Sequence, residues 1–304
     1  MCLISDDIET VSDTNILVST NIDNTRQLVV YSNYINNLSQ SNAMVLPVPN
    51  PETLKFIDLS NYKNLFNDCN SCFYNPNADF SYSTNTNSTK KSLNVFSVGS
   101  YQVSVAMNLN QIQNIDKNIF NLSNGLNEIL NKYYNKSFFG FIICKLNSGK
   151  EKYHPLAYSH KIIDSKIFIP TKHYHQEVKH NQIFQGSYID PRENIFNQNY
   201  SLLNNTHSSY ISNNQNFSNN KSSNNKSSNN EYADDWSHSI YLYNINANNN
   251  EIIKNMNSNE KIWNKKTVFN RKKINFDFDK CNNFEKIKIN GNHPNIDLII
   301  PISV

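Results

Sequence analysis

The sequence predicts a mainly β or α+β fold, with antiparallel, sandwich-like sheets, two or three short helices and disordered Asn-rich insertions. Three observations predict this fold class. Short segments rich in β-branched and aromatic residues recur along the chain. They do not alternate with helical segments, as the strands of a parallel sheet would. Asn makes up 58 of the 304 residues and gathers between the apolar segments, which is typical of low-complexity insertions.

The first part of the chain contains three predicted strands and a hairpin. Residues 25–35 are rich in β-branched and aromatic side chains, 43–51 form an apolar run that ends in prolines, and 54–60 alternate between apolar and polar. Residues 93–107 predict a hairpin, because Gly99 and Ser100 suit a tight turn. The segment 3–13 is too polar to predict a buried first strand.

Two helices interrupt this series of strands. Tyr62, Leu65, Phe66 and Cys69 have the spacing of one helical face, and Ser60 is a suitable N-cap. A longer apolar stripe at helical spacing predicts a helix over 125–135, with a core-packing role. Further strands are predicted at 138–146, 152–160, 166–175, 181–189, 238–245, 286–291 and 296–302.

The domain organisation follows from the Asn-rich segments. Residues 1–202 are expected to form the N-terminal and central part of a single β-rich domain. Residues 203–230 are a low-complexity segment that buries too little apolar area to offset the entropy of ordering, so they predict a disordered insertion. Residues 231–304 are expected to return strands to the same domain, with a second loop insertion at about 246–280.

Composition makes several function classes improbable. The net charge is +3, so the composition does not indicate a nucleic-acid partner. Only six glycines are present, and no phosphate-binding glycine motif occurs. There is no run of apolar residues long enough for a transmembrane helix, and the N-terminus lacks a signal region. These features predict a cytoplasmic protein without membrane contact. The Cys69-x-x-Cys72 pair lacks a second such pair, which favours structural thiols.

Histidines gather in one part of the chain. Residues 148–180 contain no Asn, although Asn is abundant on both sides, and five of the eight His fall there. On a strand, His173 and His175 would point to the same face about 7 Å apart. Two imidazoles so placed can share a divalent metal such as zinc. His180 or His154 would complete the ligand set, and Glu177 would be the general base. The alternative is that these rings pack in the sheet and bond to backbone groups.

Several blocks of the chain resemble a family of uncharacterised, mostly bacterial proteins. The N-terminal block reads "AMVLPVP", and the later blocks read "HPLAYSH" and "FIPTKHYHQEVKH". The resemblance covers most of 25–302 outside the Asn-rich segments and brings no known activity with it. The positions that match the family pattern are Pro47, Pro49, His154, Pro155, Pro170, Thr171, His173, His175 and His180.

Residues 261–273 combine six basic residues with Trp263 and Phe269, a pattern that can bind RNA. Acidic residues at 277 and 279 follow at once, so a solvated loop or a protein-binding segment is favoured over nucleic-acid binding. The leading hypothesis is a non-catalytic binding or structural-interaction domain with an unknown protein partner. The alternative is a metal-dependent hydrolase or oxidoreductase that uses His173, His175 and His180.

Overall fold

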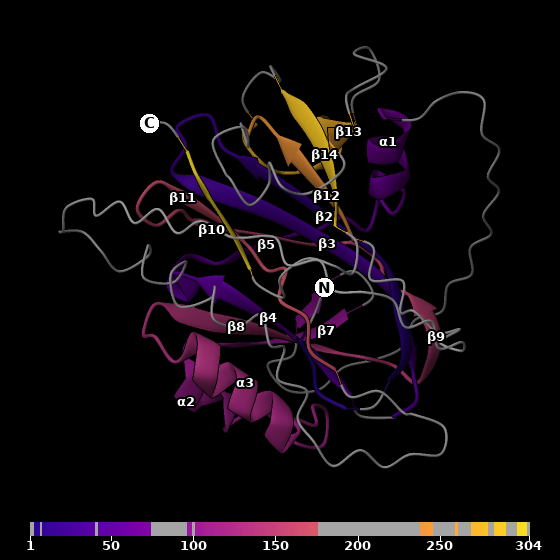
Figure 1. Ribbon diagram of the computed structural model, residues 1–304, viewed down its shortest axis with the longest axis vertical. Helices are drawn as coiled ribbons and strands as arrows, with labels where there is room; N and C mark the ends of the chain where they lie inside the picture. Colours follow the sequence, from indigo (N-terminus) through magenta and orange to yellow (C-terminus); the bar gives the residue numbers. More distant parts are fainter. Residues whose placement is uncertain are drawn as a thin grey trace, which may run out of the picture.

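The computed structural model describes residues 3–6, 8–39, 42–73, 96–98, 101–175, 238–245, 259–260, 269–278, 283–289 and 297–302. Most of these residues lie in strands of antiparallel or mixed sheets (Figure 1), which confirms the predicted fold class. The predictions for 181–189, for 203–230 and for the turn at Gly99 and Ser100 lie outside the described residues.

The smaller of the two main sheets is entirely antiparallel. Its order is β1 (Leu3–Ile4), β4 (Ala43–Pro49), β8 (Phe139–Lys145), β7 (Tyr101–Ala106) and β6 (Phe96–Val98). β6 and β7 pair as the predicted hairpin. β1 is buried, so the prediction from the polarity of residues 3–13 is wrong: Leu3 and Ile4 are apolar enough to complete the sheet edge.

The larger sheet places strands from the N-terminal and C-terminal parts of the chain side by side. Its order is β13 (Asn259–Glu260), β14 (Phe284–Ile289), β12 (His238–Tyr243), β2 (Ile8–Thr20), β3 (Arg26–Asn37), β10 (Leu156–Lys161) and β5 (Lys55–Ile57), and β9 (Gly149–Lys152) also pairs with β3. β12 runs parallel to β2, while every other pair in this sheet is antiparallel. A separate antiparallel pair joins β11 (Lys166–Ile169) to β15 (Leu298–Pro301).

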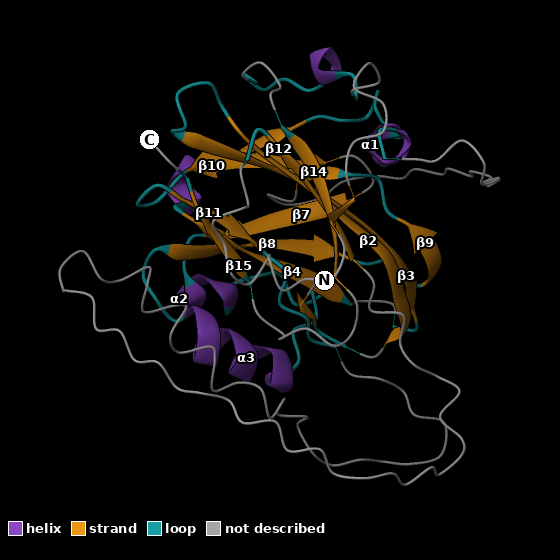
Figure 2. Cartoon of the chain, turned by 45° about the horizontal axis from the view of Figure 1, so that its top comes forward, coloured by secondary structure: helices purple, strands orange, loops and turns teal. Residues whose placement is uncertain are grey.

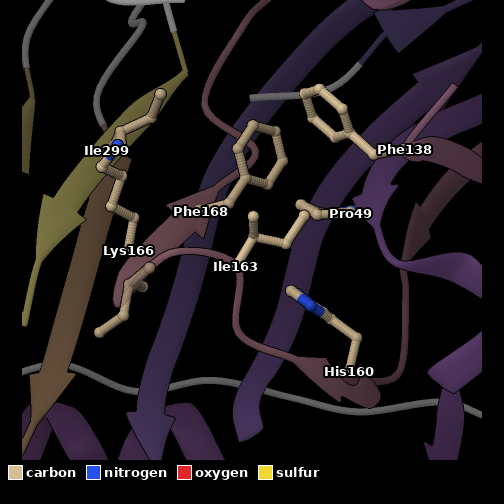
Figure 3. A pocket seen from close by; sticks show the side chains of 8 residues that line it. Pro49, Phe138, His160, Ile163, Lys166, Phe168 and Ile299 are labelled. Carbon is tan, nitrogen blue, oxygen red and sulfur yellow. The ribbon is translucent and has the colours of Figure 1, made fainter. Parts of the chain in front are cut away.

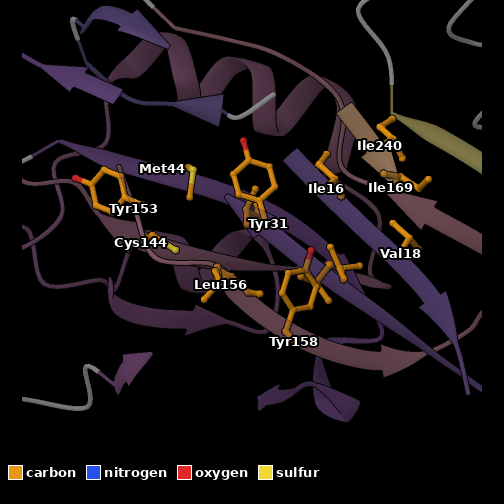
Figure 4. Packing of buried hydrophobic residues seen from close by; sticks show 14 of the residues in the cluster. Ile16, Val18, Tyr31, Met44, Cys144, Tyr153, Leu156, Tyr158, Ile169 and Ile240 are labelled. Atoms are coloured by element: carbon orange, nitrogen blue, oxygen red, sulfur yellow. The ribbon is translucent and has the colours of Figure 1, made fainter. Parts of the chain in front are cut away.

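The two main sheets face each other across the largest hydrophobic cluster (Figure 4). Val29 and Tyr31 of β3 and Leu46 of β4 point into this cluster. The alternate residues of β3, Leu28 and Val30, point to the opposite face, where a second cluster is covered by α1 (Leu65–Ser71) and by residues 269–278. Side chains of a strand alternate between faces, and β3 is buried on both: apolar residues fill its middle, while buried polar residues such as Gln27 and Ser32 hydrogen-bond to backbone groups.

The outer face of the smaller sheet is covered by α2 (Leu109–Ile112) and α3 (Asn124–Tyr134), which lie together in Figures 1 and 2. α3 confirms the predicted helix, and the hydroxyl of Ser123 caps it by accepting a bond from the Leu126 amide. α1 begins at Leu65 with Asn64 as its N-cap residue, so the predicted Ser60 cap is wrong. Ser60 instead donates its hydroxyl to Asp58 in a local turn. No helix in the described ranges is long and apolar enough to span a membrane.

Candidate functional site

The histidine segment begins where β11 ends. The sequence predicts a strand over 166–175, but β11 stops at Ile169, because Pro170 has no amide hydrogen for a ladder. The chain then makes one further backbone contact, in which Tyr174 accepts a 2.7 Å bond from the Ile4 amide of β1. This contact holds Tyr174 at the edge of the smaller sheet, between His173 and His175.

His173 and His175 lie close together, although not on the strand that the sequence predicts. Their ring centroids are 4.3 Å apart and the rings are nearly perpendicular. His173 is buried, and burial lowers its pKa well below the ordinary value, with further lowering by His175 and His238. The ring of His173 is therefore neutral at pH 7, which is the form that binds metals.

His238 is the third histidine in this group, and its spacing in the sequence did not reveal it. It is the first residue of β12, and it is buried opposite Thr14 of β2. More than sixty residues separate it from His175, so only the parallel pairing of β12 with β2 places it near His173. His173, His175 and His238 are called the histidine cluster below.

The strand opposite His238 is irregular. The register of β2 against β3 shifts between Ser12 and Asn15, and Asp13 has a positive φ of 49°. The hydroxyl of Thr14 is buried without a hydrogen-bond partner among the described residues. Bulges of this kind often lie beside functional sites, because they re-aim a side chain.

Of the other predicted site residues, the structure describes His154, which lies outside the histidine cluster. His154 lies near Asp58 and Lys63, and its Nδ1 is 3.1 Å from the carbonyl oxygen of Pro155. Burial lowers its pKa below the ordinary value. Glu177 and His180 lie outside the described residues. Within the described ranges, no group of three or more His, Cys, Asp or Glu residues is arranged to hold a metal ion.

A small cavity lies next to β10 and β11 (Figure 3). Its volume of about 10 Å³ is room for one water-sized molecule. His160 is the ionisable ring in its lining, and its Nδ1 donates to the Lys161 carbonyl at 2.9 Å in the neutral tautomer. Burial lowers the pKa of His160 to about 4. The remaining lining is Pro49, Phe138, Ile163, Lys166, Ile167, Phe168 and Ile299.

Two of the described thiols, those of Cys69 and Cys144, are also kept in their neutral form. Cys69 and Cys72 lie in the hydrophobic cluster under α1, and Cys144 of β8 lies between the sheets. Burial raises the pKa of the Cys69 and Cys144 thiols well above the ordinary value. A buried neutral thiol is a poor nucleophile and a poor metal ligand, so these residues act as apolar core.

Residues 269–278, the basic loop, carry the described part of the predicted basic segment. Its short 3₁₀ helix η3 (Arg271–Lys273) presents three cationic side chains in succession. The loop is anchored where the Asn270 amide donates to the Tyr62 hydroxyl at 2.7 Å. The Arg271 guanidinium lies 5.6 Å from the centre of the Tyr243 ring, and the Lys273 ammonium lies 4.8 Å from the centre of the Tyr62 ring. Lys63, next to Tyr62, is exposed and adds a fourth charge.

Comparison with known proteins gives a remote similarity of fold. No protein-family model matches the chain. A crystal structure of baculovirus P35 is 19% identical over 54% of this chain, with a TM-score of 0.33, and the match spans 58% of that P35 chain. A mutated baculovirus P35 after caspase cleavage is 11% identical over 95% of this chain and 99% of its own, with a TM-score of 0.43. A second such structure has a TM-score of 0.40. With values this low, the similarity gives no information on function.

Proposed function

We propose that this protein is a non-catalytic binding domain, which contacts a protein partner through its basic face. The basic face is defined as Lys63, Arg271, Lys272 and Lys273. The observation that carries the proposal is the way in which the β scaffold holds these charges. Two of the four, Arg271 and Lys273, lie over tyrosine rings, and the amide of Asn270, directly before Arg271, is anchored to the Tyr62 hydroxyl. Charges fixed by packing lose less side-chain entropy on binding than charges on mobile chains.

The state of the reactive groups supports the proposal. His160 and His173 are buried and neutral, and Cys69 and Cys144 are buried thiols with raised pKa values. Each has a packing role in the fold, whereas a general base or nucleophile works with a pKa near the operating pH and with access to substrate.

A photo-crosslinking side chain at position 272 of the full-length chain tests the proposal in the cells that express the protein. Lys272 is exposed on the basic face, and Lys117, in the segment between α2 and α3, is a matched exposed lysine away from it. We expect a discrete protein adduct from position 272 that position 117 does not give. Identical adducts at both positions, or none at 272, would contradict a binding role for this face.

The second candidate function is a metal-dependent hydrolase or oxidoreductase. The 4.3 Å separation of the His173 and His175 rings favours it, together with the position of His238. In their neutral form these imidazoles would hold a divalent ion such as zinc, which would act as a Lewis acid. The present orientation of the described residues does not form such a group, so binding would require the rings to turn or a ligand from outside the described ranges, such as His180.

Metal analysis separates the two candidates. Purified protein would contain close to one equivalent of zinc, iron or manganese if the second candidate holds, and replacing His175 by Ala would remove it. His154→Ala is the matched control, because His154 lies among different charged groups. Metal-free protein that gains no stability on addition of zinc would exclude the metal-dependent enzyme.

A further inference from the structure

We infer that the partner on the basic face is an acidic protein segment that also carries an apolar side chain. This inference rests on the proposed binding function and specifies its ligand. Arg271 of the face is half-buried, while Lys63, Lys272 and Lys273 are exposed. Carboxylates are the natural counter-charges for these cations in a protein partner.

Carboxylates also lie on or near the basic face, and they limit where an acidic segment can bind. Asp68 accepts a 2.7 Å bond from the Tyr62 hydroxyl, so its charge is partly used within the fold. Asp277 is exposed at the far end of the basic loop. The carboxylates of an acidic segment would therefore bind along Lys63 and η3 and would keep away from the Asp277 carboxylate, where like charges repel.

An exposed apolar residue lies next to the loop. The Ile22 amide donates to the Asp277 carbonyl oxygen at 3.2 Å, and the side chain of Ile22 is 53% exposed. Ile22 sits in the turn between β2 and β3, which is fixed by the contact between Asn21 and Phe278. An exposed apolar residue at the far end of the basic loop suits a partner that carries an apolar side chain next to its carboxylates.

Among the described residues, the aromatic side chains of this region do not form an RNA-binding surface, and Trp263 lies outside the described residues. In the sequence, Phe269 lies among basic residues, a pattern that predicts stacking on bases. In the structure, Phe269, Tyr62 and Tyr243 are each at most 2% exposed and pack in the cluster under α1. Their rings are occupied by other rings and by the cations above them, so bases cannot stack there.

An anionic membrane is also a poorer match than an acidic protein segment. Stable insertion requires several exposed apolar side chains on one face. Among the described residues, the large exposed apolar side chains are Ile22, Leu38 and Met107. Ile22 lies before the first residue of β3 and Leu38 lies after its last residue, so the two are at opposite ends of this strand and do not share a patch. Ile22 alone would bury too little area.

Binding of labelled peptides to the full chain tests the inference by fluorescence anisotropy. The probe is a 16-residue peptide of Asp and Glu with a central Leu-Phe pair; matched probes replace the acids by Lys, or the Leu-Phe pair by Ser. A 16-nucleotide oligouridine and vesicles with 30% phosphatidylserine represent the other two partner classes. We expect the acidic apolar peptide to bind best, and to bind more weakly as salt is raised.

Charge reversal then locates the site. The double variant Lys272→Glu with Lys273→Glu is expected to weaken binding of the acidic peptide on the order of tenfold. Lys117→Glu with Lys132→Glu makes the same change of charge near α3, on the opposite side of the fold from α1 (Figure 1), and is expected to have little effect. Ile22→Ser should weaken binding of the peptide that contains Leu-Phe and leave binding of the peptide that contains Ser unchanged.

The outcomes distinguish the inference from the function on which it rests. If oligouridine or vesicles bind more tightly than the acidic peptide, or if both charge-reversed variants lose binding equally, the acidic partner is excluded. If position 272 crosslinks a protein in cells and the acidic peptide does not bind, the binding function holds and the partner chemistry is wrong. If position 272 crosslinks no protein and the acidic peptide does not bind, both proposals fail.

Discussion

His160 shows how the fold controls the charge of a single residue. Its Nδ1 is bonded to the Lys161 carbonyl, and its Nε2 has no hydrogen-bond partner among the described residues. Burial, together with the nearby positive charge of Arg26, lowers its pKa to about 4. The ring is therefore neutral in the folded protein at pH values where the unfolded chain would already be protonated, since an unperturbed histidine has a pKa of about 6.5.

This difference predicts an acid-sensitive fold. Because the folded pKa lies below the unfolded one, the contribution of His160 to stability is complete above about pH 6.5 and is lost as the pH falls toward 4. Replacing His160 by Asn should reduce the loss of unfolding free energy between pH 7 and pH 5 by on the order of 2 kcal/mol. Urea denaturation at both pH values measures the difference. An unchanged pH dependence in the variant would contradict the neutral, buried state of this ring.

At the scale of elements, Gly140 sets the approach of β8 to its neighbours. A Cβ at this position would clash with the Pro51 ring of η1 (Pro51–Thr53) and lie 2.7 Å from the Ala106 carbonyl oxygen of β7. Gly140→Ala should therefore lower the unfolding free energy by roughly 3 kcal/mol or more, because backbone must move. Gly149→Ala is the control, since that site has open space and only its φ of 95° opposes a side chain. Equal losses in thermal unfolding would show that packing at Gly140 is unimportant.

Asp297 joins three elements at one buried carboxylate. It accepts a 2.5 Å bond from the Tyr134 hydroxyl at the end of α3 and a 2.8 Å bond from the Lys172 amide after β11, and it directly precedes β15. A double-mutant cycle of Tyr134→Phe and Asp297→Asn should give a coupling of roughly 1–3 kcal/mol in unfolding free energy. Additive effects of the two changes would mean that the bond does not connect α3 to the sheet.

The elements that could be predicted are those whose own residues carry the pattern. The stripe of Leu126 and Leu130 and the Ser123 cap are local, and they predict α3. β2 was not predicted, because its first half is polar and its apolar half becomes a central strand only through partners far along the chain. The end of β11 at Ile169 follows from Pro170, a local signal that the alternation of His173 and His175 obscured.

The candidate sites also contain some features that local sequence predicts and others that depend on distant parts of the chain. The contact of His173 with His175 follows from a two-residue spacing and could be predicted. His238 could not, since its position depends on a parallel strand pairing. For the basic segment, the sequence shows which residues are charged, but only the fold shows that Phe269 and Tyr243 point inward and leave the charges outside.

For the whole molecule, the order of strands in the larger sheet predicts that the chain cannot be divided. β12 and β14 come from the C-terminal part, and β12 pairs directly with β2 from the N-terminal part. A fragment of residues 1–202 should therefore be aggregated or unfolded alone, because β2 would present a long unpaired edge. Co-expression with residues 231–304 should restore soluble protein with the circular dichroism of the full chain. A soluble, cooperatively folded 1–202 fragment would contradict this expectation.

The parallel pairing of β2 with β12 has a consequence for synthesis. β2 ends at Thr20 and β12 begins at His238, so more than 200 residues must be translated before the partner strand exists. At about 5–20 residues per second this takes on the order of 10–40 s. During that time the nascent chain exposes a strand edge to neighbouring ribosomes and to chaperones. The length of the intervening segment adds little to the free-energy cost of pairing the two strands, because loop-closure entropy grows only with the logarithm of loop length. The hazard in making this protein is therefore one of waiting time, and slower translation after β3 should increase its aggregation.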